Sequence, residues 1–494
     1  SNMQSFVGEN HVLVKTIDGY LKVCGENYFG QLGNGANNNI NSFISIACPT
    51  ICSLPTQFST TNVTSKTATL SWTGSTGAPS GGYSYLYSTN SVLGGIEGVT
   101  SAATTNLTNL LPNTTYYWWV ASNCGSGQVN WIPAGSFTTL PTTETGCWES
   151  VSVGNYHSIG IKTDGTLWTW GKNGAGQLGD GTTITRTTPT QLGTGKNWVK
   201  IAAGYAHTVA IKADGTLWSW GYNASAQVGD GTTISKNIPT QIGTATDWAN
   251  IAAGDHYTVA LKSNGTLWAW GLNIDGQLGD GTKINKTIPI QIGTANDWKT
   301  IAAVVNHTIA TKTDGTLWTW GSNTNGQLGN GTKTEKLIPT KVGTATNWKN
   351  ASGGVSHTIA IKTDGTLWTW GDNSSGQLGD GTTTAKLNPT QIGTATDWQS
   401  VKGDYYGSSI AIKTDGTLWS WGYNTYGHLG DGTKVPKNIP TKIGTSTDRK
   451  IVAANSFNTL VISTNGFLSG CGFNDYGQIG DGITVNRTIF VPVG

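Results

Sequence analysis

The sequence predicts an all-β protein: a β-propeller whose four-stranded blades are about fifty residues long, with a β-sandwich inserted between blades 1 and 2. Three observations predict this fold. Asp-Gly or Asn-Gly pairs recur every 50 or 51 residues from Asp164 to Gly466, with one earlier copy at Asp18-Gly19. The units consist of short alternating segments bounded by Gly, Asn, Asp or Pro, which is typical of strands and turns. Residues 48–146 carry none of the marks of this repeat.

Each unit predicts four strands, A to D in chain order. In the unit around Asp214 these segments are "KIAA" (200–203), "HTVAIK" (207–212), "LWSWG" (217–221) and "PTQIG" (239–243). The Asp-Gly pair forms the turn between strands B and C, because Asp and Gly suit tight turns. Counting the early copy, the chain holds eight units. Residues 8–47 align with residues 204–243 without gaps, which favours eight blades. The alternative is seven blades and one separate unit.

Paired tryptophans mark strand C. The string "DGTLWTWG" at 164–171 recurs unchanged at 314–321 and 364–371. Trp168 and Trp170 are two residues apart on a strand, so they share one face of a blade. Since blades pack face to face, the pairs predict a packing layer between blades rather than a row of ligand sites. The first and last units replace the pair with Lys22/Cys24 and Ser469/Cys471.

The repeat resembles that of the regulator of chromosome condensation family. It is recognisable in "AAGYAHTVAIKADGTLWSWGYNASAQVGDGT" (202–232), and the match covers residues 5–47 and 147–494. The resemblance implies a propeller, which in this family usually has seven blades. The family's founding activity, nucleotide exchange on a small GTPase bound to chromatin, is not expected here, because fold alone does not carry function. A secreted β-lactamase inhibitor of similar architecture implies that such a ring can act as a pure binding surface.

The segment 48–146 resembles a fibronectin type III domain. Trp72 falls at the position of the family's core tryptophan, and Leu110, Pro112, Thr114 and Tyr116 fit its tyrosine corner. The expected domains are therefore blade 1 at 3–47, the fibronectin-like insert at 48–146, and blades 2 to 8 at 147–494.

The six cysteines are expected to form disulfides in an oxidising compartment. Cys24 and Cys471 occupy the same repeat position in the first and last units, so a bridge between them would lock a closed ring. The alternative is two free, buried cysteines. The resemblance to bacterial fibronectin-like domains implies a bridge between Cys52 and Cys124, which leaves Cys48 and Cys147 to clamp the stem of the insert. Other pairings of these four remain open.

Composition and motifs exclude several functions. Lys and Arg number 29 against 27 Asp and Glu, a net charge of +2, so nucleic-acid binding is not expected. No apolar run approaches the roughly 18 residues needed to cross a bilayer, so no membrane insertion is expected. No unrepeated set of nucleophile, base and orienting residue stands out, and no cofactor is expected. We therefore predict a protein that is not an enzyme.

Three repeated sets of polar residues have simple structural interpretations. The histidines that begin strand B are expected to stabilise a turn rather than bind metal, and the aspartates of "GDG" lack the ligand spacing of a calcium loop, so no metal site is expected. The lysines that end strand B are expected to be solvated. The three sets are His157, His207, His307 and His357; Asp180, Asp230, Asp280, Asp380, Asp431 and Asp481; and Lys162, Lys212, Lys262, Lys312, Lys362 and Lys413.

The binding face is expected where the A–B and C–D loops emerge, opposite the Asp-Gly turns and the insert. These loops differ most between repeats and are rich in aromatic residues, which contribute contact area at low entropy cost. The A–B loops hold Tyr156, Tyr205, Asp255, His256, Tyr405, Tyr406 and Phe457, among others. The predicted partner-binding residues, centred on units 7, 8 and 1, are Tyr405, Tyr406, Tyr423, Tyr426, Phe473, Tyr476, Tyr28, Phe29, Tyr222 and Tyr205.

The sequence thus predicts a monomeric, non-catalytic binding or adhesion scaffold that recognises a protein partner. The fibronectin-like insert and the expected disulfides favour a bacterial protein that is extracellular or at the cell surface. A glycan-binding module is the alternative, because exposed aromatic rings also stack on sugars. An accessory part of a polysaccharide-degrading system is a third interpretation. Parallel rings in an exposed strip would favour glycan, and a broad patch of scattered aromatics would favour protein.

Overall fold

The computed structural model describes residues 4–7, 9–15, 21–29, 32, 37–46, 54–64, 66–74, 81–111, 114–123, 131–139 and 147–494. The chain divides into two compact units, Ser1–Glu144 and Thr145–Gly494. Every regular element among the described residues is a strand, as the sequence predicts. No helix in these ranges is long and apolar enough to cross a membrane.

The N-terminal unit contains three sheets. The first has the order β1-β2-β3-β4 and comes from the first repeat: β1 (Gln4–Val7), β2 (His11–Lys15), β3 (Leu21–Gly25) and β4 (Ile40–Ile46). The other two form the sandwich, in the orders β5-β6-β9 and β11-β10-β7-β8. Their strands are β5 (Thr56–Thr61), β6 (Ala68–Thr73), β7 (Tyr83–Ser88), β8 (Ile96–Thr100), β9 (Thr104–Leu107), β10 (Thr115–Ser122) and β11 (Ile132–Thr138).

The sandwich has the core that its sequence predicts. Trp72 lies buried in one core cluster with Trp118 and Tyr116. The Tyr116 hydroxyl accepts a hydrogen bond from the Leu111 backbone N–H at 2.9 Å, which is the expected tyrosine corner.

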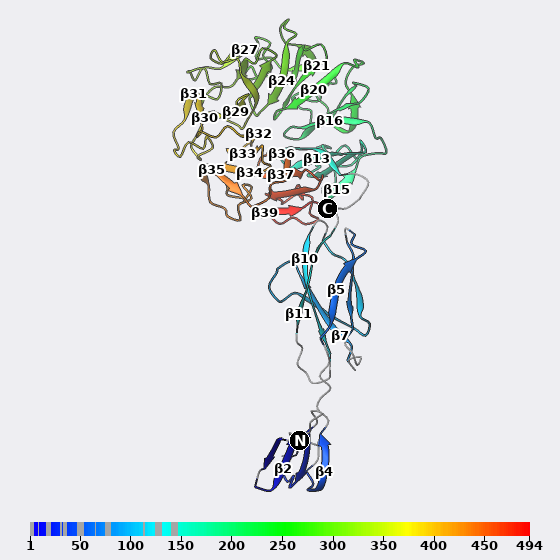
Figure 1. The fold of residues 1–494 in the computed structure, drawn as a ribbon. Coiled ribbons are helices and arrows are strands. Elements are labelled where there is room, and N and C mark those ends of the chain that lie inside the picture. The colour runs from blue at the N-terminus through cyan, green and yellow to red at the C-terminus, as the bar shows by residue number, and fades with distance from the viewer. Residues whose placement is uncertain are drawn as a thin grey trace. The chain divides into compact units, whose positions relative to one another are not determined.

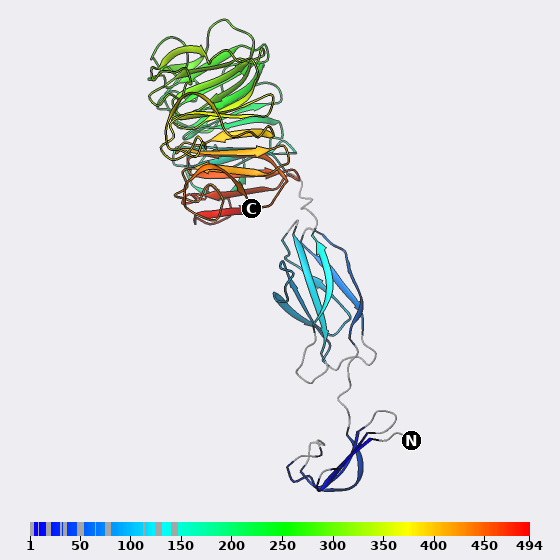
Figure 2. The same ribbon diagram turned by 60° about the vertical axis from the view of Figure 1, so that its left-hand side comes forward.

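The C-terminal unit contains seven four-stranded sheets, each with its strands paired in chain order. Figure 1 shows these sheets arranged around a central axis, and Figure 2 shows them layered one above another from the side. Unit 2 comprises β12 (Trp148–Val153), β13 (His157–Lys162), β14 (Leu167–Gly171) and β15 (Arg186–Gln191). Unit 3 comprises β16 (Trp198–Ala203), β17 (His207–Lys212), β18 (Leu217–Gly221) and β19 (Lys236–Gln241). Unit 4 comprises β20 (Trp248–Ala253), β21 (Tyr257–Lys262), β22 (Leu267–Gly271) and β23 (Lys286–Gln291).

Units 5 to 8 follow the same pattern. Unit 5 comprises β24 (Trp298–Ala303), β25 (His307–Lys312), β26 (Leu317–Gly321) and β27 (Lys336–Lys341). Unit 6 comprises β28 (Trp348–Gly353), β29 (His357–Lys362), β30 (Leu367–Gly371) and β31 (Lys386–Gln391). Unit 7 comprises β32 (Trp398–Gly403), β33 (Ser408–Lys413), β34 (Leu418–Gly422) and β35 (Lys437–Ile443). Unit 8 comprises β36 (Arg449–Asn455), β37 (Asn458–Ser463), β38 (Leu468–Gly472) and β39 (Arg487–Pro492).

Unit 8 packs directly against unit 2, so the ring closes with seven blades. Trp148, Val151 and Trp170 of unit 2 share a core cluster with Leu460 and Ile462 of unit 8. The eight-bladed ring favoured by the sequence is therefore wrong, and the seven-bladed alternative is correct. The first repeat lacks the tryptophans that pack one blade on the next: exposed Lys22 and half-buried Cys24 stand where units 2 to 7 carry the two indoles of strand C.

The two tryptophans of strand C have different roles. The second one is fully buried and donates its indole N–H to a backbone carbonyl in the preceding blade, as Trp220 does to Gln177 at 3.0 Å and Trp170 does to Gln478 at 2.9 Å. The first one, such as Trp218, is half-buried and donates to the Thr216 hydroxyl at 2.9 Å. The predicted packing layer is therefore confirmed for the second tryptophan.

The lysines that end strand B are not simply solvated, contrary to the sequence prediction. The Lys212 ammonium lies 3.8 Å from the ring centre of Trp218 and 4.8 Å from that of Trp198. The same arrangement recurs at Lys162, Lys262, Lys312, Lys362 and Lys413. Their aliphatic stems and charges cover the exposed side of the indoles, which is a favourable cation–π geometry.

The strand B histidines connect neighbouring blades instead of stabilising their own turns. His157 Nε2 lies 3.0 Å from the Thr208 hydroxyl of the next blade, and His207 Nε2 lies 3.1 Å from that of Thr258. These rings are fully buried, and burial lowers the pKa of each from 6.5 to about 3. The neutral imidazole is thus part of the packing between blades.

The structure corrects the expected cysteine bridge of the ring. Cys24 and Cys471 are both free, because unit 8 packs on unit 2 and the first repeat is not a blade of the ring. Cys471 is buried at the position of the second tryptophan, and its Sγ lies 3.5 Å from the His428 carbonyl oxygen. Cys147 is also free. Cys48, Cys52 and Cys124 lie outside the described residues.

Candidate binding face

The A–B loops and C–D loops of the ring meet on one face. Tyr156, from the loop between β12 and β13, lies with its ring centre 5.2 Å from that of Tyr476, from the loop between β38 and β39. Lys172 places its ammonium over both rings, 5.0 Å and 4.7 Å from their centres. Loops from two blades thus form one surface, as the strand order predicts.

Unit 7 contributes the most distinctive loop of this face. Its strand A to strand B connection is one residue longer than in the other blades, which places Tyr405 and Tyr406 before Gly407. Gly407 has φ +93, a conformation that favours glycine. The buried Asp404 carboxylate accepts hydrogen bonds from the Tyr406 N–H at 3.0 Å and the Ser408 N–H at 2.7 Å. The buried Asp404 side chain therefore fixes the conformation of this loop.

The same carboxylate also contacts two side chains. The Ser408 hydroxyl donates to Asp404, and His428 Nε2 lies 3.4 Å from the same carboxylate. This group contains Ser, His and Asp, but the aspartate stands between the other two, and all three are buried. A nucleophilic serine needs a histidine base next to it, so this set supports the tyrosine loop and does not form a catalytic triad. The sequence did not reveal it, because Ser408 replaces a repeat histidine.

Aromatic rings form a continuous chain of contacts across this face. Tyr406 stacks on Phe457 with ring centres 3.7 Å apart, Phe457 continues to Tyr426 at 4.3 Å, and Tyr426 to Phe473 at 5.1 Å. We call the whole set the aromatic surface: Tyr156, Tyr205, Tyr222, His256, Tyr405, Tyr406, Tyr423, Tyr426, Phe457, Phe473 and Tyr476. It spans units 7, 8, 2, 3 and 4, which are consecutive in the ring.

The aromatic surface is accessible without being flat. Each of its members is half-buried except Tyr406, which is 37% exposed. Most ring pairs are tilted or edge-on, with interplanar angles such as 76° for Tyr156 and Tyr205. The Tyr406 and Phe457 pair, at 14°, is the exception. Burial and the neighbouring phenols of Tyr156 and Tyr405 raise the pKa of Tyr406 to about 12, so the Tyr406 phenol is uncharged at neutral pH.

A single carboxylate stands at the centre of this face. Asp255, on the A–B loop of unit 4, lines the central cavity of the ring together with Tyr405. Burial raises its pKa from 3.8 to about 7, and no cation pairs with it among the described residues. Its charge in turn raises the pKa of Tyr405, after burial the largest cause.

The structure places the predicted residues as follows. Tyr405, Tyr406, Tyr423, Tyr426, Phe473 and Tyr476 lie together, and Tyr205 and Tyr222 meet at His256. Tyr28 and Phe29, which are 77% and 90% exposed, belong to the N-terminal unit and contact each other at 6.1 Å. Including them in the arc followed from the wrong blade count: with seven blades, Tyr156 of unit 2 takes the place beside unit 8.

Three residues of the aromatic surface were missed as site residues: His256, which contacts Tyr205 and Tyr222, and the two central residues Tyr156 and Phe457. Tyr156 joins the rings of units 8 and 3, and Phe457 contacts Tyr406, Tyr423, Tyr426 and Phe473. Both are visible in sequence as aromatic residues in A–B loops. They lie in the middle of the aromatic surface because unit 2 packs next to unit 8. The repeat spacing in the sequence did not predict that these two units are neighbours.

The "GDG" aspartates serve the C–D turns. Asp180 accepts hydrogen bonds from the Thr182 N–H at 3.0 Å and from Asn173 Nδ2 at 3.0 Å, and it pairs with Arg186 at 2.8 Å. Units 3, 4, 6 and 7 repeat this arrangement with a lysine, as in Asp230 and Lys236 at 3.0 Å, and unit 8 repeats it with Arg487, which pairs with Asp481 at 2.8 Å. Within the described ranges, no group of three or more His, Cys, Asp or Glu residues could hold a metal ion.

The fold and this face define a class: a seven-bladed β-propeller that presents a variable loop surface on a repeated scaffold. The profile of the RCC1-like domain matches residues 195–493, which is more than half of the chain, and that of the regulator of chromosome condensation (RCC1) repeat matches residues 164–211 and 148–177. The chain therefore belongs to the RCC1-like domain family. Residues 53–136 match the fibronectin type III domain.

Solved structures of similar fold include yeast and human proteins. Prp20p from Saccharomyces cerevisiae, studied for its binding to Gsp1p and histones, has 22% identity and a TM-score of 0.57, covering 62% of this chain and 80% of its own. Yeast RCC1 (Prp20) in complex with Kap60 has 22% identity and a TM-score of 0.60, covering 67% and 83%. Human WBSCR16 has 18% identity and a TM-score of 0.60, covering 67% and 94%. At these identities the likeness concerns the fold. Curated protein sequences give no match.

Proposed function

We propose that this protein is a non-catalytic binding scaffold that recognises a protein partner through the aromatic surface. The observation that carries the proposal is the unbroken chain of ring contacts over five adjacent blades, from Tyr405 to Tyr222. The rings are pre-positioned by one another and by Asp404, so little side-chain entropy is lost on binding. Aromatic residues in such settings commonly dominate binding energy.

Ring orientation supports a protein partner rather than a glycan. A sugar-binding platform needs exposed, parallel rings, whereas these rings are mostly half-buried and tilted, as with Tyr426 and Phe473 at 76°. The solved relatives point the same way: Prp20p is described with Gsp1p and histones, and yeast RCC1 with Kap60. A broad surface of uneven relief suits shape-complementary protein contact.

We further propose that the protein is monomeric and works outside the cell or at a bacterial cell surface, as an adhesion or binding protein. The fibronectin type III domain that precedes the propeller in the chain supports this proposal. The sparse charge of the chain, 29 basic against 27 acidic residues, also supports a partner that is not nucleic acid.

The test uses the whole chain and two matched double variants. Tyr405→Ala with Tyr423→Ala removes two rings of the aromatic surface, and Tyr28→Ala with Phe29→Ala removes two exposed rings of the N-terminal unit. Each protein is used to capture partners from cell-surface extracts and is applied to a glycan array, and captured partners are then measured by purified binding. We expect the first variant to lose a specific protein partner and the second to keep it.

Two results would contradict the proposal. Equal binding by the first variant and the unaltered chain would remove the aromatic surface as the site. Specific, Tyr405-dependent binding to the array without any protein partner would make the protein a glycan-binding module instead.

A further inference from the structure

The centre of the ring holds a cavity of about 400 Å³. It is lined by strand A of all seven blades, and most of its lining residues are small or apolar, such as Ala252, Ala302 and Gly353. A cavity of this size accommodates a small molecule. Charged groups within it are therefore few and can be considered individually.

Lys402 lines this cavity at a position of strand A where the other blades carry a small residue. In the other six blades the corresponding residue of strand A is Ala or Ser: Ser152, Ala202, Ala252, Ala302, Ser352 and Ala453. Lys402 makes no ion pair with any described residue. Its side chain contacts solvent in the cavity, while the protein around it disfavours the ammonium and lowers its pKa. An unpaired cation is costly in such a place unless an anion accompanies it.

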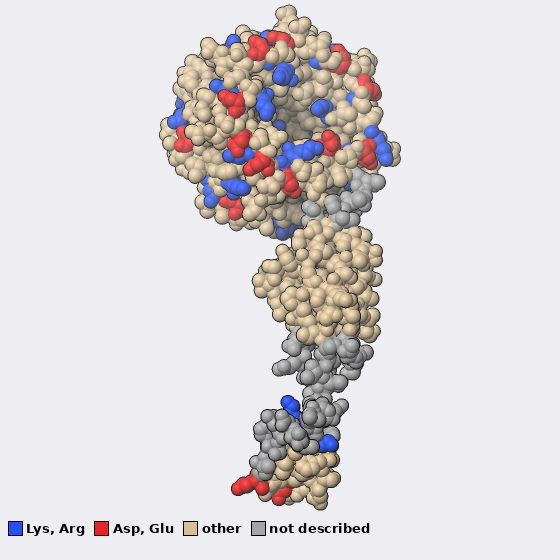
Figure 3. Space-filling view, viewed as in Figure 1, with Lys and Arg blue, Asp and Glu red and all other residues tan. Residues whose placement is uncertain are grey.

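Further lysines lie where the A strands begin. Lys349 lines the cavity from the second position of β28, in a β-bulge, and Lys299 and Lys450 hold the same position in β24 and β36. Lys200 holds the third position of β16, which corresponds to the cavity-lining Thr300. Figure 3 shows Lys and Arg side chains gathered around the central hollow of the ring.

These lysines are not neutralised by neighbouring acids. The aspartates of the adjacent loops pair with strand B lysines instead, as in Asp247 with Lys262 at 3.0 Å and Asp297 with Lys312 at 2.9 Å. Among the described residues, none of Lys200, Lys299, Lys349 or Lys450 forms an ion pair. Glu149 is the one carboxylate at the corresponding strand positions. Of the described residues, Asp255 is the one carboxylate that lines the cavity itself, on the A–B loop of unit 4, and burial raises its pKa to about 7. The end of the cavity where the A strands begin therefore carries an excess of positive charge, which concentrates anions.

We propose that the central cavity is a binding site for a compact polyanion, a small molecule with two or more phosphate or carboxylate groups. Lys402 contacts it inside the cavity, and Lys349 with its neighbours holds it at the end where the A strands begin. This site lies along the A strands, whereas the aromatic surface is formed by the A–B and C–D loops. Tyr405 is the one member of that surface that also lines the cavity. The lysine ammonium, a compact point charge with three donors, suits both kinds of oxyanion.

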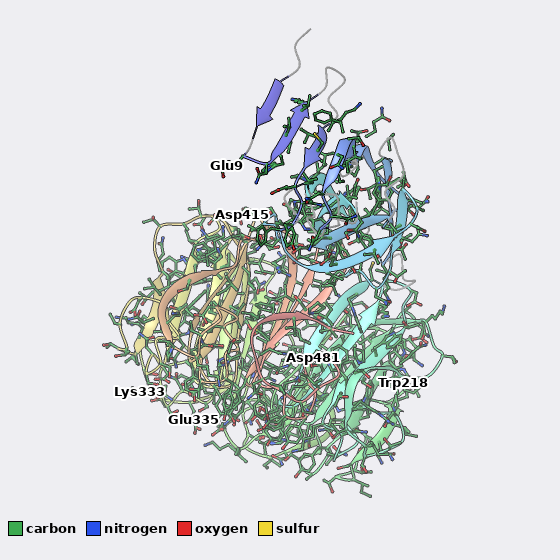
Figure 4. The ribbon with its side chains drawn as sticks, turned by 90° about the horizontal axis from the view of Figure 1, so that it is seen from below. Glu9, Trp218, Lys333, Glu335, Asp415 and Asp481 are labelled. Atoms are coloured by element: carbon green, nitrogen blue, oxygen red, sulfur yellow. The ribbon has the colours of Figure 1, made fainter. Side chains whose placement is uncertain are left out.

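The test measures binding of inorganic tripolyphosphate and of citrate to the whole protein by isothermal titration calorimetry. Lys402→Ala introduces the residue found in units 3, 4, 5 and 8, and Lys349→Gln introduces the residue that unit 7 carries as Gln399, so both variants should fold. Lys333→Gln is the matched control: it removes the same charge from a C–D loop on the outer side of the ring, where Figure 4 labels Lys333 and Glu335. Thermal unfolding verifies that each variant is folded.

We expect saturable one-to-one binding of at least one probe, weakened by added salt, and about a tenfold or greater loss of affinity for Lys402→Ala, since a charged hydrogen bond is removed. Lys349→Gln should lose less affinity for the probe than Lys402→Ala does, and Lys333→Gln should bind the probe like the unaltered chain. The proposal is overturned if neither probe shows saturable binding. It is equally overturned if Lys402→Ala keeps full affinity or if Lys333→Gln loses as much.

Discussion

The buried histidines between blades should make the ring acid-sensitive well above the range in which carboxylates titrate. His157, His207 and His307 have pKa values of about 3 in the folded protein, against 6.5 when unfolded, and His357 has one of about 4. A depressed histidine pKa means that the unfolded state binds the extra proton, so stability falls as pH drops below about 6.5. At pH 5 each such histidine lowers the free energy of unfolding by about 2 kcal/mol, from about 1.4 kcal/mol per pH unit.

A substitution isolates this contribution from that of every other titrating group. His207→Asn introduces the residue that unit 8 carries as Asn458 at the same position, and it removes the contact of His207 Nε2 with the Thr258 hydroxyl. At pH 7.5 the variant should be less stable than the unaltered chain by about 1–3 kcal/mol. At pH 5 the difference should shrink by about 2 kcal/mol, because the asparagine variant has lost one proton-binding site of the unfolded state.

The assay is urea unfolding followed by tryptophan fluorescence. Of the 22 tryptophans, all but Trp72, Trp118, Trp119 and Trp131 lie in the ring, so the signal of these eighteen reports on the blades. Tyr257→Phe is the control, since burial raises the pKa of the Tyr257 phenol further and it stays protonated throughout. Its stability cost should be equal at both pH values. If the difference in unfolding free energy between His207→Asn and the unaltered chain is the same at pH 7.5 and at pH 5, the reasoning fails.

Three further outcomes are expected. Trp220→Ala should cost about 3–5 kcal/mol of unfolding free energy in the same assay and Trp218→Ala clearly less, because the Trp220 indole is fully buried between blades and the Trp218 indole is half-buried; equal costs would contradict their different roles. Asp404→Asn should weaken partner binding more than it weakens the ring, measured by affinity and thermal unfolding, because Asp404 holds the Tyr406 loop; unchanged affinity would show that the loop is not needed. Asp255→Asn should raise the unfolding temperature at pH 8 but not at pH 4. The pKa of Asp255 is raised to about 7 in the folded protein, so ionisation of this buried carboxyl destabilises the fold as pH rises toward that value, and asparagine removes this effect. An equal effect at both pH values would refute the raised pKa of Asp255.

Periodicity predicted the repeated scaffold but not which blades are neighbours. The spacing of the Asp-Gly turns and the "LWTW" strands predicted the blades correctly, because each is set by local turn chemistry and alternation. The number of blades in the ring depends on packing at the single seam, where Trp170 donates to the Gln478 carbonyl. Eight aligned units gave no information on that contact. The error displaced Tyr28 and Phe29 into the predicted arc and kept Tyr156 out of it.

In the candidate sites, too, local features could be predicted from the sequence, and groupings that depend on packing could not. Aromatic loop residues could be selected from sequence, since they stand out against near-identical strands. Asp404, Ser408 and His428 could not be grouped, because they lie in two loops and at the start of β33 and replace three different repeat residues. Lys402 was also visible as a departure from Ala or Ser. Its meaning depends on strand A lining a cavity, which only the closed ring reveals.

The seam of the ring has a mechanical consequence. Each blade is built from four consecutive strands, so no strand from one end of the chain completes a sheet at the other end. Closure depends on side-chain packing and on the bonds that Trp170 and Ser158 donate to the Gln478 carbonyl, at 2.9 Å and 2.8 Å. Tension applied between Cys147 and Gly494 therefore acts first on two adjacent blades and opens the seam, while the other five blades carry load only afterwards.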